Sequence, residues 1–364
     1  MKIKFLKSII IVAVFVIFGC QDNNLKTNIS SESQTETVEQ TQDNIYFDYL
    51  YENNAYTPSD EILEATGFPI VRIQTLDESL IDSKTEWKEM SFVVSGSFCG
   101  YEDLEISGNI KGRGNTTWNF SKKSYSIKLD SKSKILGMKK NKRWVLLANQ
   151  ADKSLLRNSF FSYLGNNIYK EEWNPSFKTV HLFINDEYRG VYLLGEQIKI
   201  DENRVNVTDI SKIEPNDEGD YDGGFIFEID GRYGEVFNFT TSHGVPICLK
   251  DPDEVNEQTW QFAKSIIQTA ENALFSDSFE DSELGYSKYF DIDSIVDWYI
   301  MNELGKNVDA AFFSSIYFYY NPTDKLLHMG PSWDFDLSCG KTNVRGCDNS
   351  DGLYIKEFSV WIKR

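Results

Sequence analysis

The chain has 364 residues, of which 41% are hydrophobic and 26% are charged, enough apolar surface for one large core or two ordinary ones. A disordered or fibrous protein is therefore excluded. With 56 acidic and 37 basic residues the formal net charge is -19, which argues against a nucleic-acid partner held by a basic face. An anion bound by this chain needs a local basic patch or a metal ion.

The first twenty residues have the pattern of an export signal. Three lysines precede an apolar run over residues 8–18, and Gly19 and Cys20 follow it. The run is too short to remain as a membrane-spanning helix. Its end, Ile-Phe-Gly-Cys, resembles the lipobox of bacterial lipoproteins, in which the cysteine is lipidated and becomes the first residue of the mature chain. A plain cleaved signal with an incidental cysteine is the alternative.

We therefore expect a signal peptide over residues 1–19, a lipid anchor at Cys20 and a place in the cell envelope, outside the cytoplasm. Residues 21–44 contain no aromatic residue, no glycine and no proline, so a disordered tether is predicted over 20–44. Globular composition begins at Ile45, and we expect one domain over 45–364, of one or two lobes. Its last eight residues, EFSVWIKR, contain four apolar residues and no helix stop signal, and we expect a truncated C-terminus.

Four further cysteines are an even number, which suits a compartment that permits disulfides. They are Cys99, Cys248, Cys339 and Cys347. The last two flank a turn-rich segment, and the sequence leaves open whether they form a disulfide or stay free thiols. The absence of a CxxC pair and the presence of only three histidines argue against a zinc or haem site.

Short β-branched and aromatic runs dominate the first half of the chain, and helical periodicity dominates the second. The predicted strands span 69–75, 124–130, 143–149, 179–184, 190–200, 223–230, 314–320 and 325–330, and the predicted helices span 153–168, 254–275 and 291–304. The strands at 179–184 and 190–200 flank a turn-like segment and are predicted to form a hairpin. This order indicates an α+β fold with a sheet-rich N-terminal lobe and a helix-rich C-terminal lobe.

The sharpest local signal is Trp333-Asp334-Phe335-Asp336. In an extended segment, residues two apart point to the same side. Asp334 and Asp336 are therefore predicted to converge on one hard cation such as Mg²⁺, which prefers carboxylate, phosphate and water oxygens, while Trp333 and Phe335 pack the other way. The alternative is a solvated turn or a helix cap.

A second acidic group follows the predicted end of the 291–304 helix. Asn307 and Asp309 lie in the loop between that helix and the next strand. Such a pair resembles the phosphotransfer arrangement, in which the aspartate accepts the proton of the substrate hydroxyl and the asparagine holds a metal. A helix C-cap followed by a turn explains the same residues.

Basic residues gather between positions 111 and 143, where eleven of them occur. On so acidic a chain this stretch indicates a local anion site or a solvated face. Within it, Gly112-Arg113-Gly114 is predicted either to expose its backbone amides to a phosphate or to form a tight turn. No GxxxxGK[ST] phosphate-binding loop is present in the sequence.

Five blocks of the chain resemble, in order, the spore-coat-protein-H (CotH-type) kinases. They are residues 112–129, 136–158, 180–198, 223–230 and 307–336. The resemblance implies an atypical, secreted protein-kinase-like fold in which a small sheet-rich lobe lies over a helical lobe with ATP and Mg²⁺ between them. It further implies transfer of the ATP γ-phosphate to Ser or Thr hydroxyls of a protein substrate on the cell surface or in the envelope.

The same resemblance assigns roles to residues. Asp309 matches the catalytic acid, and Asp334 or Asp336 matches the metal-binding acid, with Asn307 as a further metal ligand.

For the phosphate side of the nucleotide the candidates are Arg113, Lys123 and Lys128, with Glu196 as a partner for one of them or for the nucleotide. For Lys128, on an alternating strand, a solvent-facing charge is an equal alternative. Asp152, Arg157 and Asn158 also fall in a matching block, but capping of the following helix explains them equally well.

Two other functions compete with a kinase. A surface lipoprotein would use a kinase-like body as a non-catalytic binding or adhesion module, since ATP is scarce outside the cytoplasm. A metal-dependent glycosyltransferase would use D-x-D to hold a sugar nucleotide, but no Rossmann-type half is recognisable in the sequence. The sequence does not identify the substrate.

Overall fold

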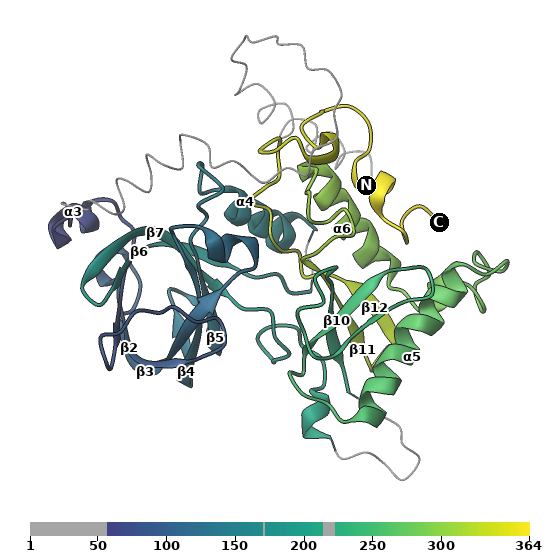
Figure 1. Cartoon of the computed structure of the whole chain (residues 1–364), viewed down its shortest axis with the longest axis horizontal. Helices are drawn as coiled ribbons and strands as arrows, with labels where there is room; N and C mark the ends of the chain where they lie inside the picture. The colour runs from purple at the N-terminus through teal and green to yellow at the C-terminus, as the bar shows by residue number, and fades with distance from the viewer. Residues whose placement is uncertain (1–56, 170–171, 214–222) are drawn as a thin grey trace. The chain divides into compact units, whose positions relative to one another are not determined.

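The structure is a computed structural model that describes residues 57–169, 172–213 and 223–364 (Figure 1). All of these belong to one compact unit, Asn54–Arg364. The predicted signal peptide, Cys20 and the tether lie outside the described residues. None of the helices within the described ranges combines the length and apolar character needed to span a bilayer.

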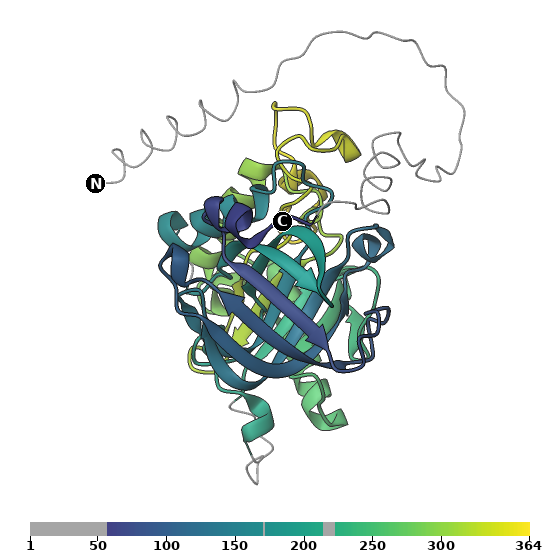
Figure 2. The same ribbon diagram turned by 90° about the vertical axis from the view of Figure 1, so that its left-hand side faces the viewer.

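Seven strands close into a barrel in the order β1-β2-β3-β4-β5-β7-β6 (Figure 1, Figure 2). They are β1 Ile70–Thr75, β2 Lys88–Ser95, β3 Leu104–Arg113, β4 Ser124–Ile135, β5 Met138–Leu147, β6 Phe177–Ile184 and β7 Glu187–Glu196. Neighbours are antiparallel except β1 and β6, which pair in parallel and close the ring.

Alternation of side chains along the strands fills the barrel interior. Phe92, Ile127, Trp144 and Leu194 from four strands belong to one buried cluster, while intervening residues such as Lys128 face outward and are exposed. The predicted hairpin at 179–200 is confirmed as β6 and β7, which are joined by a two-residue turn with positive φ at both positions, as a type I′ turn requires.

A second sheet, of five strands, has the order β12-β11-β8-β10-β9. Its strands are β8 Phe225–Ile229, β9 Asn238–Thr240, β10 Pro246–Asp251, β11 Ile316–Asn321 and β12 Leu326–Met329. Helices α5 (Glu257–Leu274) and α6 (Ile292–Gly305) share a buried core with this sheet. Each begins at a side-chain cap, Asn256 for α5 and Asp291 for α6, which satisfies a backbone N–H that the first turn leaves unpaired.

Three shorter helices complete the described residues: α3 Asp60–Ala65, α4 Arg157–Leu164 and α7 Ile355–Phe358. The predicted helix over 153–168 begins four residues later than expected, at α4, and continues into a wider turn over Gly165–Tyr169.

The expected kinase-like architecture, with a sheet-rich N-lobe over a helix-rich C-lobe, is wrong. The N-terminal part is a closed barrel, and the C-terminal part is organised around a five-stranded sheet. Mixing of helix and strand was predicted correctly, and α5 and α6 lie where the periodicity placed them. The periodicity did not reveal that β8 pairs with both β10 and β11, because strand pairing between distant segments leaves no local pattern.

The four described cysteines are free thiols. Of the two alternatives for Cys339 and Cys347, the structure therefore shows free thiols and not a disulfide. Hydrogen bonds hold this segment instead. The Cys339 N–H donates to the Gly305 carbonyl at 2.7 Å, and the Cys347 thiol donates to the Thr342 carbonyl at 3.0 Å.

A buried ion pair lies at one end of the barrel. Arg204 donates to Glu196 at 2.6 Å, and its guanidinium lies over the rings of Trp144 and Trp173. Glu196 also accepts the Ser176 N–H at 3.0 Å. Burial raises the pKa of Glu196, partly offset by the Arg204 charge. Glu196 therefore pairs with Arg204 in the protein interior.

Replacing Glu196 by alanine is expected to lower the free energy of unfolding by about 3 kcal/mol, because it leaves the Arg204 charge buried without its partner. Urea unfolding of the Glu196→Ala variant measures this. Lys128→Ala, an exposed change on the same barrel, is the control and should unfold like the unmodified chain. A loss for Glu196→Ala no larger than that of the control would show that the pair contributes nothing to stability.

Candidate functional site

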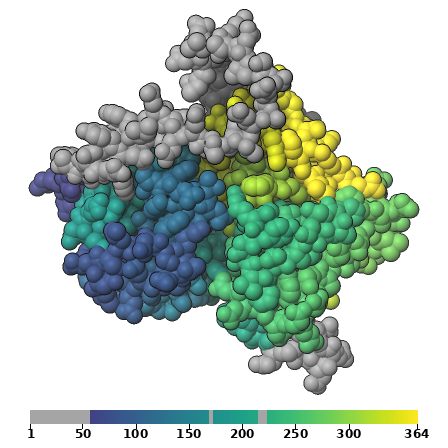
Figure 3. All heavy atoms as spheres, viewed as in Figure 1, coloured from purple at the N-terminus to yellow at the C-terminus, as the bar shows by residue number. Residues whose placement is uncertain are grey.

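A cavity of ≈ 360 Å³ lies where the end of β3 and the following turn meet the second sheet. From the barrel side it is lined by Arg113, Gly114, Asn115, Thr116, Thr117, Phe120, Lys122, Ser124, Leu147, Ala148, Asn149, Gln150 and Ala151. Asn158 and residues around the second sheet complete the wall: Glu228, Asp230, Arg232, Gly234, Glu235, Lys250, Asp309, Ser315, Tyr317, Trp333, Asp334, Asp336 and Leu337. In the space-filling view the surface is hollowed between the blue barrel residues and the green residues that follow β7 (Figure 3).

Four aspartates line this cavity: Asp230, which directly follows β8, and Asp309, Asp334 and Asp336, which lie in two loops. Asp309 follows α6, which ends where Lys306 adopts a left-handed conformation. Asp334 is itself left-handed, with φ of 64°, so the two aspartates after β12 do not share a side through strand alternation as predicted. Trp333 also lines the cavity, contrary to expectation, whereas Phe335 is buried.

Burial raises the pKa of Asp309, Asp334 and Asp336, and repulsion between carboxylates adds to the effect at Asp309 and Asp336. The pKa of Asp309 rises to about 7, through burial and then through the nearby Asp334 charge. The pKa of Asp336 is raised well above its ordinary value by burial and by the charges of Asp334 and Asp309. The pKa of Asp334 is raised by burial and lowered in part by its hydrogen bond from Ser315. These groups therefore favour a proton or a cation in the cavity.

Positive groups face the carboxylates across the same cavity. The Arg113 guanidinium lies 5.2 Å from the centre of the Trp333 ring, and its Nη1 is buried without a hydrogen-bond partner. Lys122 donates to the carbonyls of Ala148 and Val191, and burial lowers the pKa of its amine to about 8. Both groups suit an anion bound beside the aspartates.

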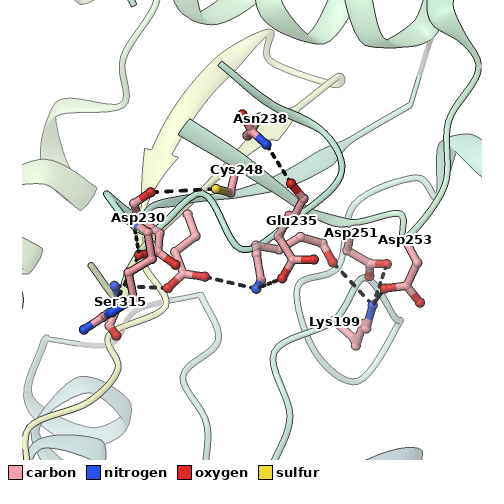
Figure 4. Close-up of polar contacts among 11 residues, drawn as sticks. Lys199, Asp230, Glu235, Asn238, Cys248, Asp251, Asp253 and Ser315 are labelled. Atoms are coloured by element: carbon pink, nitrogen blue, oxygen red, sulfur yellow. Dashed lines mark hydrogen bonds and ion pairs between the residues drawn. The ribbon is translucent and has the colours of Figure 1, made fainter. Parts of the chain in front are cut away.

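A chain of polar contacts connects β10 to Asp334. Lys250 pairs with Glu228 at 3.1 Å and also with Glu235. The backbone N–H of Ser315 donates to Glu228, and its hydroxyl donates to Asp334, both at 3.1 Å. Figure 4 shows the part of this network around Asp230, Glu235 and Ser315, and a neighbouring group in which Lys199 pairs with Asp251 and Asp253. The network ties one cavity carboxylate to the strands of the second sheet.

The other predicted residues lie away from the cavity wall. Lys123 donates to the Trp118 carbonyl and lies over the Trp118 ring, so it holds the turn after β3. Lys128 is exposed on the outer face of the barrel, and Glu196 pairs with Arg204. Asn307 is buried, with its Nδ2 donating to Asn302 at 3.1 Å, while its Oδ1 has no partner.

The glycines beside Arg113 have steric roles. A Cβ on Gly112 would lie 2.1 Å from the Trp118 ring, and Gly114 has φ of +105°, a conformation that other residues rarely adopt. The tight-turn interpretation of this segment therefore explains Gly114, which also lines the cavity.

Sequence reasoning missed several cavity residues. Glu228 lies between Phe227 and Ile229 in the wholly buried strand β8, and the buried Asp230 follows this strand directly. Acidic residues within and beside so apolar a strand could have indicated a site. No local sequence pattern marked Lys250 and Tyr317 as site residues, because their position at the cavity depends on how β8, β10 and β11 pair.

A divalent cation such as Mg²⁺ needs oxygen ligands, which the aspartates of the cavity could provide. Within the described ranges, no three or more His, Cys, Asp or Glu side chains are already arranged around a metal position. Magnesium, however, commonly takes only one or two carboxylates and completes its shell with water and phosphate oxygens. Asp334 and Asp336 provide that donor set, and their raised pKa values show that nearby positive charge is favoured. The residues present therefore fit a magnesium ion.

The raised pKa of Asp309 predicts a dependence of stability on pH. In the unfolded chain this carboxyl ionises near its ordinary value of 3.8, whereas in the folded chain it holds its proton to about pH 7. The folded state thus binds more protons between these values, and stability falls as pH rises through that window. The stabilising effect of Asp309→Asn should be larger at pH 8 than at pH 5 by about 3 kcal/mol.

Urea unfolding with a metal chelator at the two pH values measures this difference. Asp277→Asn, at an exposed position in the described part of the chain, is the matched control and should show no such change. Equal effects of the Asp309 substitution at both pH values would mean that this carboxyl is not held protonated by its surroundings.

Comparison with known proteins gives one family. The family model described as CotH kinase protein matches residues 110–364. A search of curated proteins found no match. The resemblance drawn from the five sequence blocks is confirmed, and because the model matches well over half of the sequence, the chain belongs to the CotH kinase family.

Proposed function

We propose that this chain is an atypical kinase that transfers the γ-phosphate of ATP to Ser or Thr hydroxyls of a protein substrate, with Mg²⁺ as cofactor. One observation carries the proposal: Asp309, Asp334 and Asp336 line the same cavity as Arg113 and Lys122. Phosphoryl transfer depends on positioning and charge neutralisation more than on covalent help from the protein. Membership of the CotH kinase family supports the same reaction.

Asp334 and Asp336 are the residues that would hold the metal. When bound, the ion would neutralise charge on the phosphate oxygens, which is its usual contribution to this class of reaction. Ser315 keeps the Asp334 carboxylate oriented by donating to its Oδ2. Asn307, whose free Oδ1 is buried outside the cavity lining, is not needed in this role.

Asp309 would accept the proton of the attacking hydroxyl. A general base works best when its pKa lies near the working pH, and burial together with the Asp334 charge raises the pKa of Asp309 to about 7. Positive charge placed between Asp334 and Asp336 would lower that pKa and leave Asp309 ionised when substrate is bound.

Arg113 and Lys122 would hold the phosphates. The Arg113 guanidinium is fixed in orientation against Trp333 and has one buried nitrogen without a partner, so it has a donor available for a phosphate oxygen. Lys122 is fixed by two carbonyls of the barrel. Rigid donors of this kind lower the cost of reorganisation during the reaction.

The export pattern of residues 1–20 adds a location to this proposal. Lipidation at Cys20 would anchor the protein at a membrane outside the cytoplasm, where the acceptor would be a protein of the envelope or cell surface. The chain would then act on substrates within reach of that anchor.

Transfer of labelled phosphate from ATP to Ser- and Thr-containing peptides, or to the chain itself, tests the proposal. Asp309→Asn should slow transfer by about 10²-fold or more, the usual contribution of a general base, while binding of ATP and Mg²⁺ persists. Asp334→Asn should abolish both transfer and magnesium-dependent binding.

Lys128→Ala, far from the cavity, is the control and should leave the rate unchanged. Transfer that survives in both aspartate variants, or no transfer by a folded chain that binds ATP, would contradict the proposal.

A further inference from the structure

Helix α4 contacts the segment that carries Asp334 and Asp336 at three points. The Oδ1 of Asn158 accepts the backbone N–H of Phe335 at 2.8 Å. The ring of Phe161 stacks on that of Phe335, with centres 4.0 Å apart and planes at 11°. The Nε of Arg157 donates to the Ser338 carbonyl at 2.9 Å. One short helix thus fixes both the backbone and the side chain between the two aspartates.

The Asn158 contact bears directly on the orientation of the two carboxylates. The Phe335 N–H belongs to the peptide that follows Asp334, and Asp334 has a left-handed φ of 64°. A non-glycine residue holds such a conformation only when its surroundings impose it. Rotation of this peptide would turn the Asp334 and Asp336 side chains away from each other, and the hydrogen bond to Asn158 opposes that rotation.

Asn158 is itself held in one orientation. Its Nδ2 donates to the Oδ1 of Asn149 at 3.1 Å, so its carbonyl oxygen is left to face Phe335. The start of α4 is fixed by fully buried Asp152, which accepts the Arg157 N–H at 3.0 Å and pairs with the Arg157 guanidinium. Helix capping therefore explains Asp152 and Arg157, but it does not explain Asn158, whose side chain points out of the helix to Phe335 and lines the cavity.

We propose that Asn158 is a positioning residue of the metal site: by binding the Phe335 N–H it holds Asp334 and Asp336 in the relative orientation that a divalent cation requires. The inference rests on the proposed function, since it assumes that these two carboxylates hold the ion. Groups that orient metal ligands without touching the metal commonly change metal affinity 10–100-fold when they are removed.

Binding of AMP-PNP, a non-hydrolysable ATP analogue, to the full chain tests this without turnover. Calorimetry over a range of free Mg²⁺ gives the magnesium concentration at half-maximal effect, and a titration in a chelator gives the metal-independent affinity. Asn158→Ala should raise the half-maximal magnesium concentration about 10–100-fold and leave the metal-independent affinity unchanged. A purely structural role would lower both affinities or neither.

Two further variants test whether the hydrogen-bond acceptor of Asn158 or the volume of its side chain is what matters. Asn158→Asp keeps an oxygen for the Phe335 N–H, and Asn149, whose Nδ2 has no partner, would turn its amide to donate to it. This variant should stay close to the wild-type magnesium requirement. Asn158→Leu keeps the side-chain volume but has no hydrogen-bond acceptor, so it should behave like Asn158→Ala. If the alanine variant does not melt cooperatively, the leucine variant takes its place in the experiment. Asn167→Ala, at an exposed asparagine that donates to the Tyr163 carbonyl, is the matched control.

The outcomes distinguish this inference from the proposed function. A wild-type chain whose AMP-PNP binding ignores magnesium would contradict the proposed function and the inference together. A magnesium-dependent wild type with an unchanged requirement in folded Asn158→Ala or Asn158→Leu would overturn the inference alone. An Asn158→Asp variant as impaired as Asn158→Leu would also overturn it, because the acceptor would then not be what matters.

Discussion

Repulsion among partly and fully buried carboxyl groups is the constraint on which the rest of the site depends. Asp309, Asp334 and Asp336 line one cavity, and burial raises the pKa of each. Repulsion adds to the shift at Asp309, from Asp334, and at Asp336, from Asp334 and Asp309. Without bound charge this arrangement opposes folding, since ionised carboxylates in a poorly solvated place are costly. A protein retains such a cluster at a cost in stability, which is typical of functional sites.

Contacts from several elements of the fold hold these carboxylates in place. Ser315 and Glu228 connect Asp334 to the second sheet, and α4 holds the backbone between Asp334 and Asp336 through Asn158. The barrel contributes Arg113 and its stacking on Trp333. These contacts come from elements far apart in the chain, so the cavity depends on the correct pairing of β8 with β10 and β11 and on the closure of the barrel.

The sequence predicted the parts of this account that local patterns encode. Alternation and turn residues located β1, β4 to β8, β11 and β12, and helical periodicity located α5 and α6. Asp309, Asp334, Asp336 and Arg113 were singled out, and the structure brings these four to one cavity. Barrel closure, the second sheet and the contributions of Lys250 and Tyr317 depend on pairing between distant strands, which no local pattern reports. Lys123, Lys128 and Glu196 do not line that cavity, and the sequence could not show this, because a charged residue beside or within a strand reveals neither the face it occupies nor the partner it contacts.

The central claim, that Asp334 and Asp336 form a cation site beside a phosphate-binding group, is tested most directly by diffraction. A crystal grown with Mn²⁺ in place of Mg²⁺ and with AMP-PNP would reveal the ion by anomalous scattering. The account predicts a peak within coordination distance of both carboxylates, with analogue phosphate oxygens on the side of Arg113. A peak elsewhere in the molecule, with these carboxylates unoccupied in the presence of bound analogue, would contradict it.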